Sequence, residues 1–270
     1  MRNLLGLIYG MVYGVALVVP GFSGGTFLVI FGCYDTICEA FALNFKAIKK
    51  NFLFLVCFGI GAVGGLIGFA HAIVYLLSIF AIPTSFFFMG LILGGIPMIL
   101  KLACEDEKLK PVCIVPFLIG FFLVISLFLM ENFGIATDFN QEQSFVFSLS
   151  IMVYSFFTAI AMIIPGISGA FILVAFGVYD LFMEALKSFN FTVLIPAAAG
   201  ILLGIVAGAK LVLLVISKFK LMVYSMIMGL VVGSVAPLFP SGAGFNTATL
   251  LSLICFIIGG LITFKLAQRN

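Results

Sequence analysis

The sequence predicts an all-α, polytopic membrane protein that consists of two copies of one unit. Of the 270 residues, 64% are hydrophobic and 9% are charged, which leaves too little polar surface to cover a soluble globule. Apolar runs follow one another almost without pause, each near the ~20 residues that a helix needs to cross the hydrocarbon core. Pro-Gly-x-Ser-Gly, Phe-Gly, Tyr-Asp and Glu-Ala recur at identical spacing in segments 20–41 and 165–186, which indicates a duplication.

The duplication continues downstream in a slightly different register. We call the alignment of the two halves that places Pro20 on Pro165 the upstream register. We call the alignment that places Gly61 on Gly200 the downstream register. A fold built from two copies of one unit usually places its functional site where the copies meet. The downstream register also aligns Gly65 with Gly204, Gly90 with Gly229, Leu91 with Leu230, Gly94 with Gly233, and His71 with Lys210.

We expect a first inverted repeat at residues 1–131, an acidic extracytoplasmic linker at 132–144 and a second inverted repeat at 145–270. Each repeat is expected to hold a broken, re-entrant helical hairpin and three transmembrane helices. In the first repeat the expected helices cover 2–19, 24–43, 52–80, a segment from the turn at 81–84 to about 100, and 112–130. In the second they cover 145–164, 169–187, 191–217, 221–236 and 248–264.

The two Pro-Gly-x-Ser-Gly segments interrupt the helices of each hairpin. Proline removes a backbone donor and glycine permits positive φ, so each segment is expected to form a turn with exposed amides. The charge pattern allows the hairpins either to span the membrane or to turn back halfway. We favour re-entry, because such a turn is tolerated at membrane depth only where it is buried in protein or lines a wet cavity.

The distribution of basic residues predicts the orientation. If each hairpin returns to its starting side, 11 of the 13 Lys and Arg residues lie on one face, which by the positive-inside rule is cytoplasmic. Both termini are then cytoplasmic, and three further spans in each repeat make the second copy inverted. The 11 residues are Arg2, Lys46, Lys49, Lys50, Lys101, Lys108, Lys110, Lys218, Lys220, Lys265 and Arg269.

The expected helix at 52–80 carries two pairs of glycines that lie four positions apart, Gly61 with Gly65 and Gly64 with Gly68. This spacing allows two helix backbones to approach closely. We therefore predict that this helix is packed inside the bundle.

The two breaks are the candidate substrate site. A helix start with serine, glycine and free amides favours an anion, because the unpaired N–H groups and the positive end of the helix dipole point the same way. The alternative is that these residues only cap and break a helix, and the presence of two copies in inverted positions argues for binding. The candidate substrate-binding residues at the breaks are Pro20, Gly21, Ser23, Gly24, Gly25, Thr26, Pro165, Gly166, Ser168 and Gly169.

Lys210 is a further candidate for substrate binding, since it lies in the middle of the apolar stretch 201–217. A charge there costs roughly 2.5 to 3.5 kcal/mol on insertion scales, so it is expected to face a cavity or a partner. The alternative is a lysine that snorkels to the interface. His71, at the equivalent position, is a candidate titratable donor, although a lone histidine is more often a hydrogen-bonded interior residue.

Four carboxylates repeat in both halves and share one face of the helix after each break. Asp35 and Glu39 in the first half correspond to Asp180 and Glu184 in the second. They are candidates for proton coupling or for pairing with Lys210. The alternative is that they mark a solvated helix end.

The doubled Pro-Gly-x-Ser-Gly break, followed by Gly-x-Tyr-Asp and a later Gly-Leu-x-x-Gly, resembles a bacterial membrane family regarded as polyprenyl phosphate transporters and formerly catalogued as a domain of unknown function. The resemblance covers nearly the whole chain. It implies a flippase in the bacterial plasma membrane that returns undecaprenyl phosphate, the carrier lipid of envelope polymers, from the outer to the inner leaflet. The matching segments are residues 20–24, 32–35, 90–94, 165–169, 177–180 and 229–233.

The second copy departs from the pattern of the first at one point. Residues 168–171 read Ser-Gly-Ala-Phe, where residues 23–26 read Ser-Gly-Gly-Thr. The loss of the threonine suggests that the first break contributes more hydrogen bonds to the substrate.

Two other functions compete with lipid transport. A secondary transporter or channel for a small anion or another solute fits the inverted repeat equally well. A membrane enzyme such as a lipid phosphatase ranks third, because it needs a nucleophile beside an acid or base and the single histidine lies at neither break.

The expected partners are a polyprenyl phosphate and membrane lipids, and the sequence leaves a homo-oligomer open. The net charge of +3 is too small to indicate nucleic acid. We expect no cofactor and no metal site, because the six cysteines form no Cys-x-x-Cys pair and have no histidine nearby.

Overall fold

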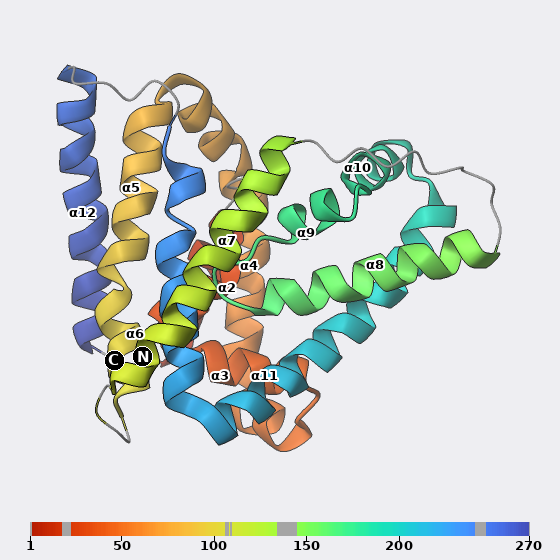
Figure 1. Ribbon diagram of the computed structural model, residues 1–270, viewed down its shortest axis with the longest axis horizontal. Helices are drawn as coiled ribbons and strands as arrows, with labels where there is room; N and C mark the ends of the chain where they lie inside the picture. The colour runs from red at the N-terminus through yellow and green to blue at the C-terminus, as the bar shows by residue number, and fades with distance from the viewer. Residues whose placement is uncertain are drawn as a thin grey trace.

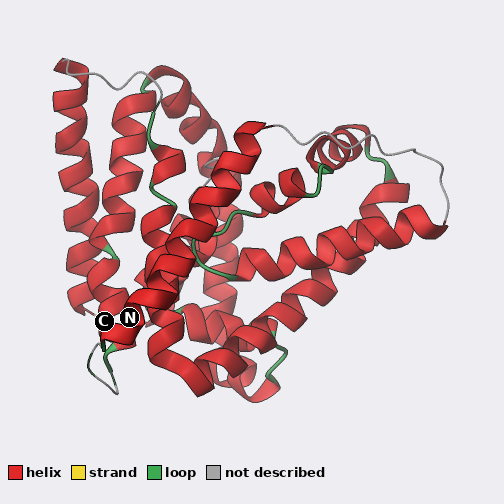
Figure 2. Ribbon diagram, in the orientation of Figure 1, coloured by secondary structure: helices red, strands yellow, loops and turns green. Residues whose placement is uncertain are grey.

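Helices account for all regular structure in the part of the chain that the computed structural model describes, residues 2–17, 23–105, 108, 110–133, 145–240 and 247–269 (Figure 2). The all-α prediction is therefore confirmed. The α-helices are α1 (Arg2–Ala16), α2 (Gly24–Ile30), α3 (Tyr34–Phe41), α4 (Phe45–Ile79), α5 (Ala81–Gly94), α6 (Ile96–Ala103), α7 (Ile114–Phe133), α8 (Phe145–Ile163), α9 (Gly169–Ala175), α10 (Tyr179–Ser188), α11 (Phe191–Gly233) and α12 (Thr247–Arg269). Two short 3₁₀ helices, η1 (Pro111–Cys113) and η2 (Ala236–Leu238), complete the set.

Five of the described helical stretches are long and apolar enough to cross a membrane, which supports a multi-pass membrane protein. The last of them has 48 residues, and it kinks at Phe219 (φ −136°, ψ 42°). This kink lies between the two helices that were expected at 191–217 and 221–236. The five stretches are Phe45–Phe69, Ala81–Ala103, Pro111–Leu129, Phe145–Ile163 and Phe191–Leu238.

The helix after each break is shorter than the sequence suggested. The single helix expected at 24–43 is divided into α2 and α3, and the one expected at 169–187 is divided into α9 and α10. The divisions fall at Gly32 and Gly177, which take positive φ angles of 64° and 68°. Glycine adopts this conformation without a Cβ clash, so the repeated Phe-Gly motif marks a second turn rather than a helical position.

Equivalent helix pairs form in the two halves of the chain. A Cβ atom on Gly61 of α4 would collide with the carbonyl of Leu7 in α1, and one on Gly200 of α11 would collide with the carbonyl of Met152 in α8. The upstream register aligns Leu7 with Met152, and the downstream register aligns the two glycines. The glycines thus allow α4 to lie against α1 in the same way as the first half of α11 lies against α8.

Two further pairs join one half of the chain to the other. Gly90 of α5 lies against the carbonyl of Phe256 in α12, and Gly229 of α11 lies against the carbonyl of Phe117 in α7. The downstream register relates these contacts as well. Figure 1 shows α5 and α12 side by side, while α8 and the first half of α11 run across the view at a large angle to them. The two halves therefore exchange helices rather than fold as separate bodies.

The prediction that the helix at 52–80 is packed inside the bundle is wrong, because α4 packs through one face. Gly61 and Gly65 face α1, whereas a Cβ on Gly64 or Gly68 would have no atom within 4 Å. Ile67 on the open side is 69% exposed. Lipid is as apolar as a leucine side chain, so a helix that is apolar all round has no need to be buried in protein.

The two faces of α4 predict different effects of the same substitution. Gly65→Leu would drive a side chain into the carbonyl of Met11 in α1, and we expect a loss of roughly 1–3 kcal/mol of stability from this overpacking. Gly64→Leu, at the preceding position, adds a side chain to open space and serves as the matched control. Thermal unfolding in detergent measures both, and equal destabilisation would contradict the packing of α1 on α4.

Candidate substrate site at the junction of the breaks

The described parts of the two breaks meet. A Cβ built on Gly25, in the first turn of α2, would lie 3.3 Å from the Cα of Pro165 and 3.3 Å from the carbonyl oxygen of Ile163. Gly166 has a φ of 88°, as expected for a glycine turn, and it lies against Leu230 of α11. Of the predicted site residues, Pro20 and Gly21 lie outside the described residues.

A tyrosine that the site prediction did not include ties the two halves together at this junction. The hydroxyl of Tyr34 in α3 donates a hydrogen bond of 2.9 Å to the carbonyl oxygen of Ile163. Ile163 is the last residue of α8, where helix carbonyls lose their partners within the helix. The side chain of Tyr34 is only 2% exposed. The repeated Tyr-Asp motif was the sequence signal for this residue.

Three hydroxyl groups near the junction are buried and have no hydrogen-bond partner among the described residues. They belong to Ser23, Thr26 and Thr158, which are 5%, 2% and 5% exposed. A buried hydroxyl without a partner costs roughly 1–3 kcal/mol. Such groups are rare in folded proteins, so three of them near one junction make it the candidate site for a polar ligand.

Thr158 is a site candidate that the sequence analysis missed. Its Cγ2 atom would lie 3.4 Å from a Cβ on Gly169, the first residue of α9, so it borders the second break. The upstream register aligns it with Tyr13, whose ring lies against Gly24 in the first break. Because the two residue types differ, the alignment that found the repeated motif gave no signal for the threonine.

The serines do not cap their helices, which argues against the alternative interpretation of the motif. Ser23 and Ser168 occupy the N-cap positions of α2 and α9, and neither side chain makes the capping hydrogen bond. The amide of Thr26 is paired with the carbonyl of Ser23 at 3.1 Å, so it is not one of the expected free amides. Ser168 is partly exposed, whereas Ser23 is buried.

The structure does not bring Lys210 to the breaks. Its side chain is exposed on α11 and pairs with none of the described side chains. Gly208 packs near Ile163 at the end of α8, so Lys210, two residues further along α11, lies at a similar depth. Two residues of a helix are rotated by about 200°, so Lys210 points to the opposite side of α11 from Gly208. His71 lies in α4, and its side chain is outside the described part of the structure.

The four repeated carboxylates lie on α3 and α10 with the expected spacing. Asp35 is exposed and accepts a hydrogen bond of 3.5 Å from the hydroxyl of Tyr224, while Glu39 is partly buried. Asp180 and Glu184 are both exposed. Within the described residues none of the four pairs with Lys210, so the expectation of such a pair is not met.

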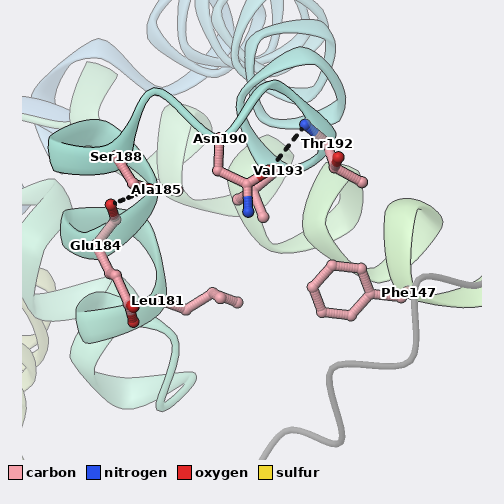
Figure 3. A pocket seen from close by; sticks show the side chains of 8 residues that line it. All are labelled: Phe147, Leu181, Glu184, Ala185, Ser188, Asn190, Thr192 and Val193. Carbon is pink, nitrogen blue, oxygen red and sulfur yellow. Dashed lines mark hydrogen bonds between the residues drawn. The ribbon is translucent and has the colours of Figure 1, made fainter.

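Glu184 borders a cavity of about 80 Å³ beside α10, shown in Figure 3. The polar groups around it form hydrogen bonds at the ends of helices. The hydroxyl of Ser188 donates to the carbonyl of Glu184 at 2.8 Å, and the side chain of Asn190 accepts from the amide of Thr192 at 3.1 Å. A cavity of this size holds a few waters at most. It is a less suitable substrate site than the junction of the breaks.

Comparison with known proteins agrees with the resemblance in the motifs. A polyprenyl-phosphate transporter of Staphylococcus aureus (strain NCTC 8325 / PS 47) is 30% identical over an alignment 275 residues long, gaps included, which covers 98% of this chain and 96% of that protein. A polyprenyl-phosphate transporter of Vibrio cholerae serotype O1 (strain ATCC 39315 / El Tor Inaba N16961) is 26% identical over 254 residues, 89% of this chain and 79% of that protein. No solved structure matches the chain significantly. The family model described as VCA0040-like, undecaprenyl phosphate translocase-like, matches residues 2–106 and 44–251, and the chain belongs to this family.

Proposed function

We propose that this protein transports a polyprenyl phosphate across the bacterial plasma membrane and binds the phosphate where the two breaks meet. The observation that carries the proposal is the group of buried, unpartnered hydroxyls of Ser23, Thr26 and Thr158. The names of the two relatives support the class of lipid. Net movement from the outer to the inner leaflet, which would recycle the carrier lipid, is part of the same proposal.

The chemistry of a phosphate monoester fits these hydroxyls. Burying the charge of the phosphate without hydrogen bonds costs far more free energy than a single hydrogen bond contributes. Several donors must therefore converge on the phosphate. Ser23 and Thr26 lie in the first break and Thr158 borders the second, so donors come from both halves of the chain. A ligand held by both halves can be released when the halves move relative to each other.

Lys210 is proposed to meet the phosphate on its way to the junction. It is exposed in an apolar helix at a depth similar to that of the second break, where a lone cation attracts the anionic headgroup of a lipid. His71, at the equivalent position of α4, is proposed as the matching donor. Asp35, Asp180 and Glu184 are exposed and can exchange protons with solvent, and Glu39 is partly buried. We propose these four carboxylates for proton coupling.

We propose that the two halves are inverted re-entrant repeats. The 15 residues of α1 extend about 22 Å, less than the ~30 Å hydrocarbon core, and the seven residues of α2 are shorter still. The matched contacts of Gly61 with Gly200 and of Gly90 with Gly229 support the repeat. The helix α8 is long enough to cross the core upright, but it lies at a large angle to α5 and α12 in Figure 1.

Transport in vesicles tests the proposed function. Purified protein in liposomes is expected to move a short-chain polyprenyl phosphate between leaflets, and a prenyl phosphate in excess is expected to compete. The neutral prenyl alcohol of the same length lacks the charge that the hydroxyls recognise and is expected not to compete. Equal competition by the alcohol would contradict the phosphate site. Release of trapped inorganic phosphate without lipid movement would favour a small-anion transporter instead.

A further inference from the structure

A second cavity, of about 320 Å³, adjoins the first break. It lies among α1, α2, α4, α5 and α12. Ala16, at the end of α1, and Phe27, in α2, line it from the two sides of the break. Phe27 follows Thr26 in the chain, so the cavity borders the helix that carries one of the unpartnered hydroxyls. The cavity and the proposed phosphate site therefore share the helix that begins at the first break.

The lining of this cavity excludes a polar occupant. Thr263 is the one residue with a polar side chain among the described residues that line it. The hydroxyl of Thr263 is already bonded to the carbonyls of Gly259 and Gly260, at 3.2 and 3.3 Å. The remaining lining residues are aliphatic, methionine or phenylalanine, and an apolar cavity offers water no partners. The occupant that fits is a hydrocarbon.

The cavity also reaches the outer surface of the protein. Phe69 of α4 and Ile262 of α12 line it and are 45% and 43% exposed. The parts of α4 and α12 around these two residues are apolar, so the exposed side chains face lipid in a membrane. A lipid whose phosphate lies at the break can therefore pass its chain through the cavity and out into the bilayer.

We propose that this cavity holds the isoprene units next to the phosphate and so selects a prenyl chain over a straight alkyl chain. This inference rests on the proposed function, which supplies the phosphate end of the same lipid. A cavity of roughly 150 Å³ takes up benzene, so about 320 Å³ has room for roughly ten carbon atoms, or two isoprene units. The rest of the chain stays in lipid.

Selection must come from shape rather than from burial. A chain that leaves the bilayer gains no hydrophobic free energy in an apolar cavity, because both surroundings are hydrocarbon. Phe27, Phe31 and Phe88 contribute flat, rigid faces to the lining. The methyl branches and planar double bonds of a prenyl chain fill a short, wide cavity of this kind better than a flexible straight chain does, because close packing rewards matched shape.

The equivalent region of the second half packs into a hydrophobic cluster and provides a control. The upstream register aligns Ala16 with Ala161 and Phe27 with Ile172, and the downstream register aligns Leu91 with Leu230. The second-half members of these pairs pack together in one hydrophobic cluster around Val124, which is fully buried. A substitution on the cavity side can therefore be matched with one at the equivalent position of the packed side.

Competition between geranyl phosphate and n-decyl phosphate tests the proposal, since the two share a headgroup and the number of carbon atoms in the hydrocarbon part. With the wild-type protein in nanodiscs, geranyl phosphate is expected to displace a labelled short-chain polyprenyl phosphate about tenfold better, a typical selectivity for a hydrophobic pocket. Val15→Phe, which fills the cavity, is expected to remove this preference. Ile160→Phe, at the position equivalent to Val15 in α8, is expected to keep it.

Each outcome distinguishes the cavity from the phosphate site. Equal displacement by both compounds from the wild type, or an unchanged preference in Val15→Phe, overturns the cavity as the prenyl site and leaves the phosphate site standing. Displacement by neither compound overturns the proposed function itself. If Val15→Phe does not fold, the wild-type protein can be labelled with a prenyl phosphate that carries a photoreactive diazirine on its second isoprene unit. Labelled peptides from α2, α5 and α12 support the proposal, and labelling of α7 alone overturns it.

Discussion

The double variant Ser23→Ala with Thr26→Val is expected to lose transport by roughly a hundredfold and yet to unfold at a higher temperature than the wild type. Two hydrogen bonds to a charged phosphate, at about 1.5 kcal/mol each, account for the loss of transport. The gain in stability follows because both hydroxyls are buried without a partner among the described residues, and removing such a group relieves a cost of roughly 1–3 kcal/mol. Vesicle transport and thermal unfolding without lipid measure the two effects.

Buried serines that have partners provide the control for this experiment. Ser155 and Ser225 are each 1% exposed, and their hydroxyls donate to the carbonyls of Ile151 at 2.8 Å and Leu221 at 2.7 Å. Changing either serine to alanine removes a satisfied bond, so we expect a small loss of stability and normal transport. A double variant that is less stable and transports normally would show that Ser23 and Thr26 have a structural role only.

Gly25→Leu is expected to abolish transport by forcing the two breaks apart. A Cβ at this position already lies 3.3 Å from the backbone of Pro165, and the larger side chain has no room between the two segments. The hydroxyls of the first break would then move away from Thr158, and the phosphate would lose donors from one side. We expect a destabilisation of roughly 1–3 kcal/mol along with complete loss of transport.

A graded series separates this effect from general damage to the fold. Gly25→Ala adds only the Cβ atom, which its neighbours can accept by moving a few tenths of an ångström, and it is expected to keep part of the transport activity. Gly64→Leu adds the same bulk as Gly25→Leu to the open side of α4 and is expected to transport normally. Full transport by Gly25→Leu would mean that substrate does not bind between the breaks.

Composition and local pattern determined the class of the fold. The length and apolar character of the helices are properties of contiguous residues, so the all-α, membrane-spanning architecture could be predicted without knowing any contact. The duplication could be predicted as well, because the same motifs recur at constant spacing. Even the placement of Asp35 and Glu39 along one helix follows from spacing alone.

Tertiary structure decided which of these residues meet. Thr158 borders the second break, and Tyr34 bonds to a carbonyl 129 residues away, because helices distant in sequence end at one junction. Whether a hydroxyl has a partner depends on those neighbours, so no pattern identifies Ser23 and Thr26 as unpaired. Likewise, lysine in an apolar run predicts membrane depth, but the direction of Lys210 is set by how α11 packs on α8. Periodicity reports the local backbone, whereas a binding site depends on contacts between distant segments.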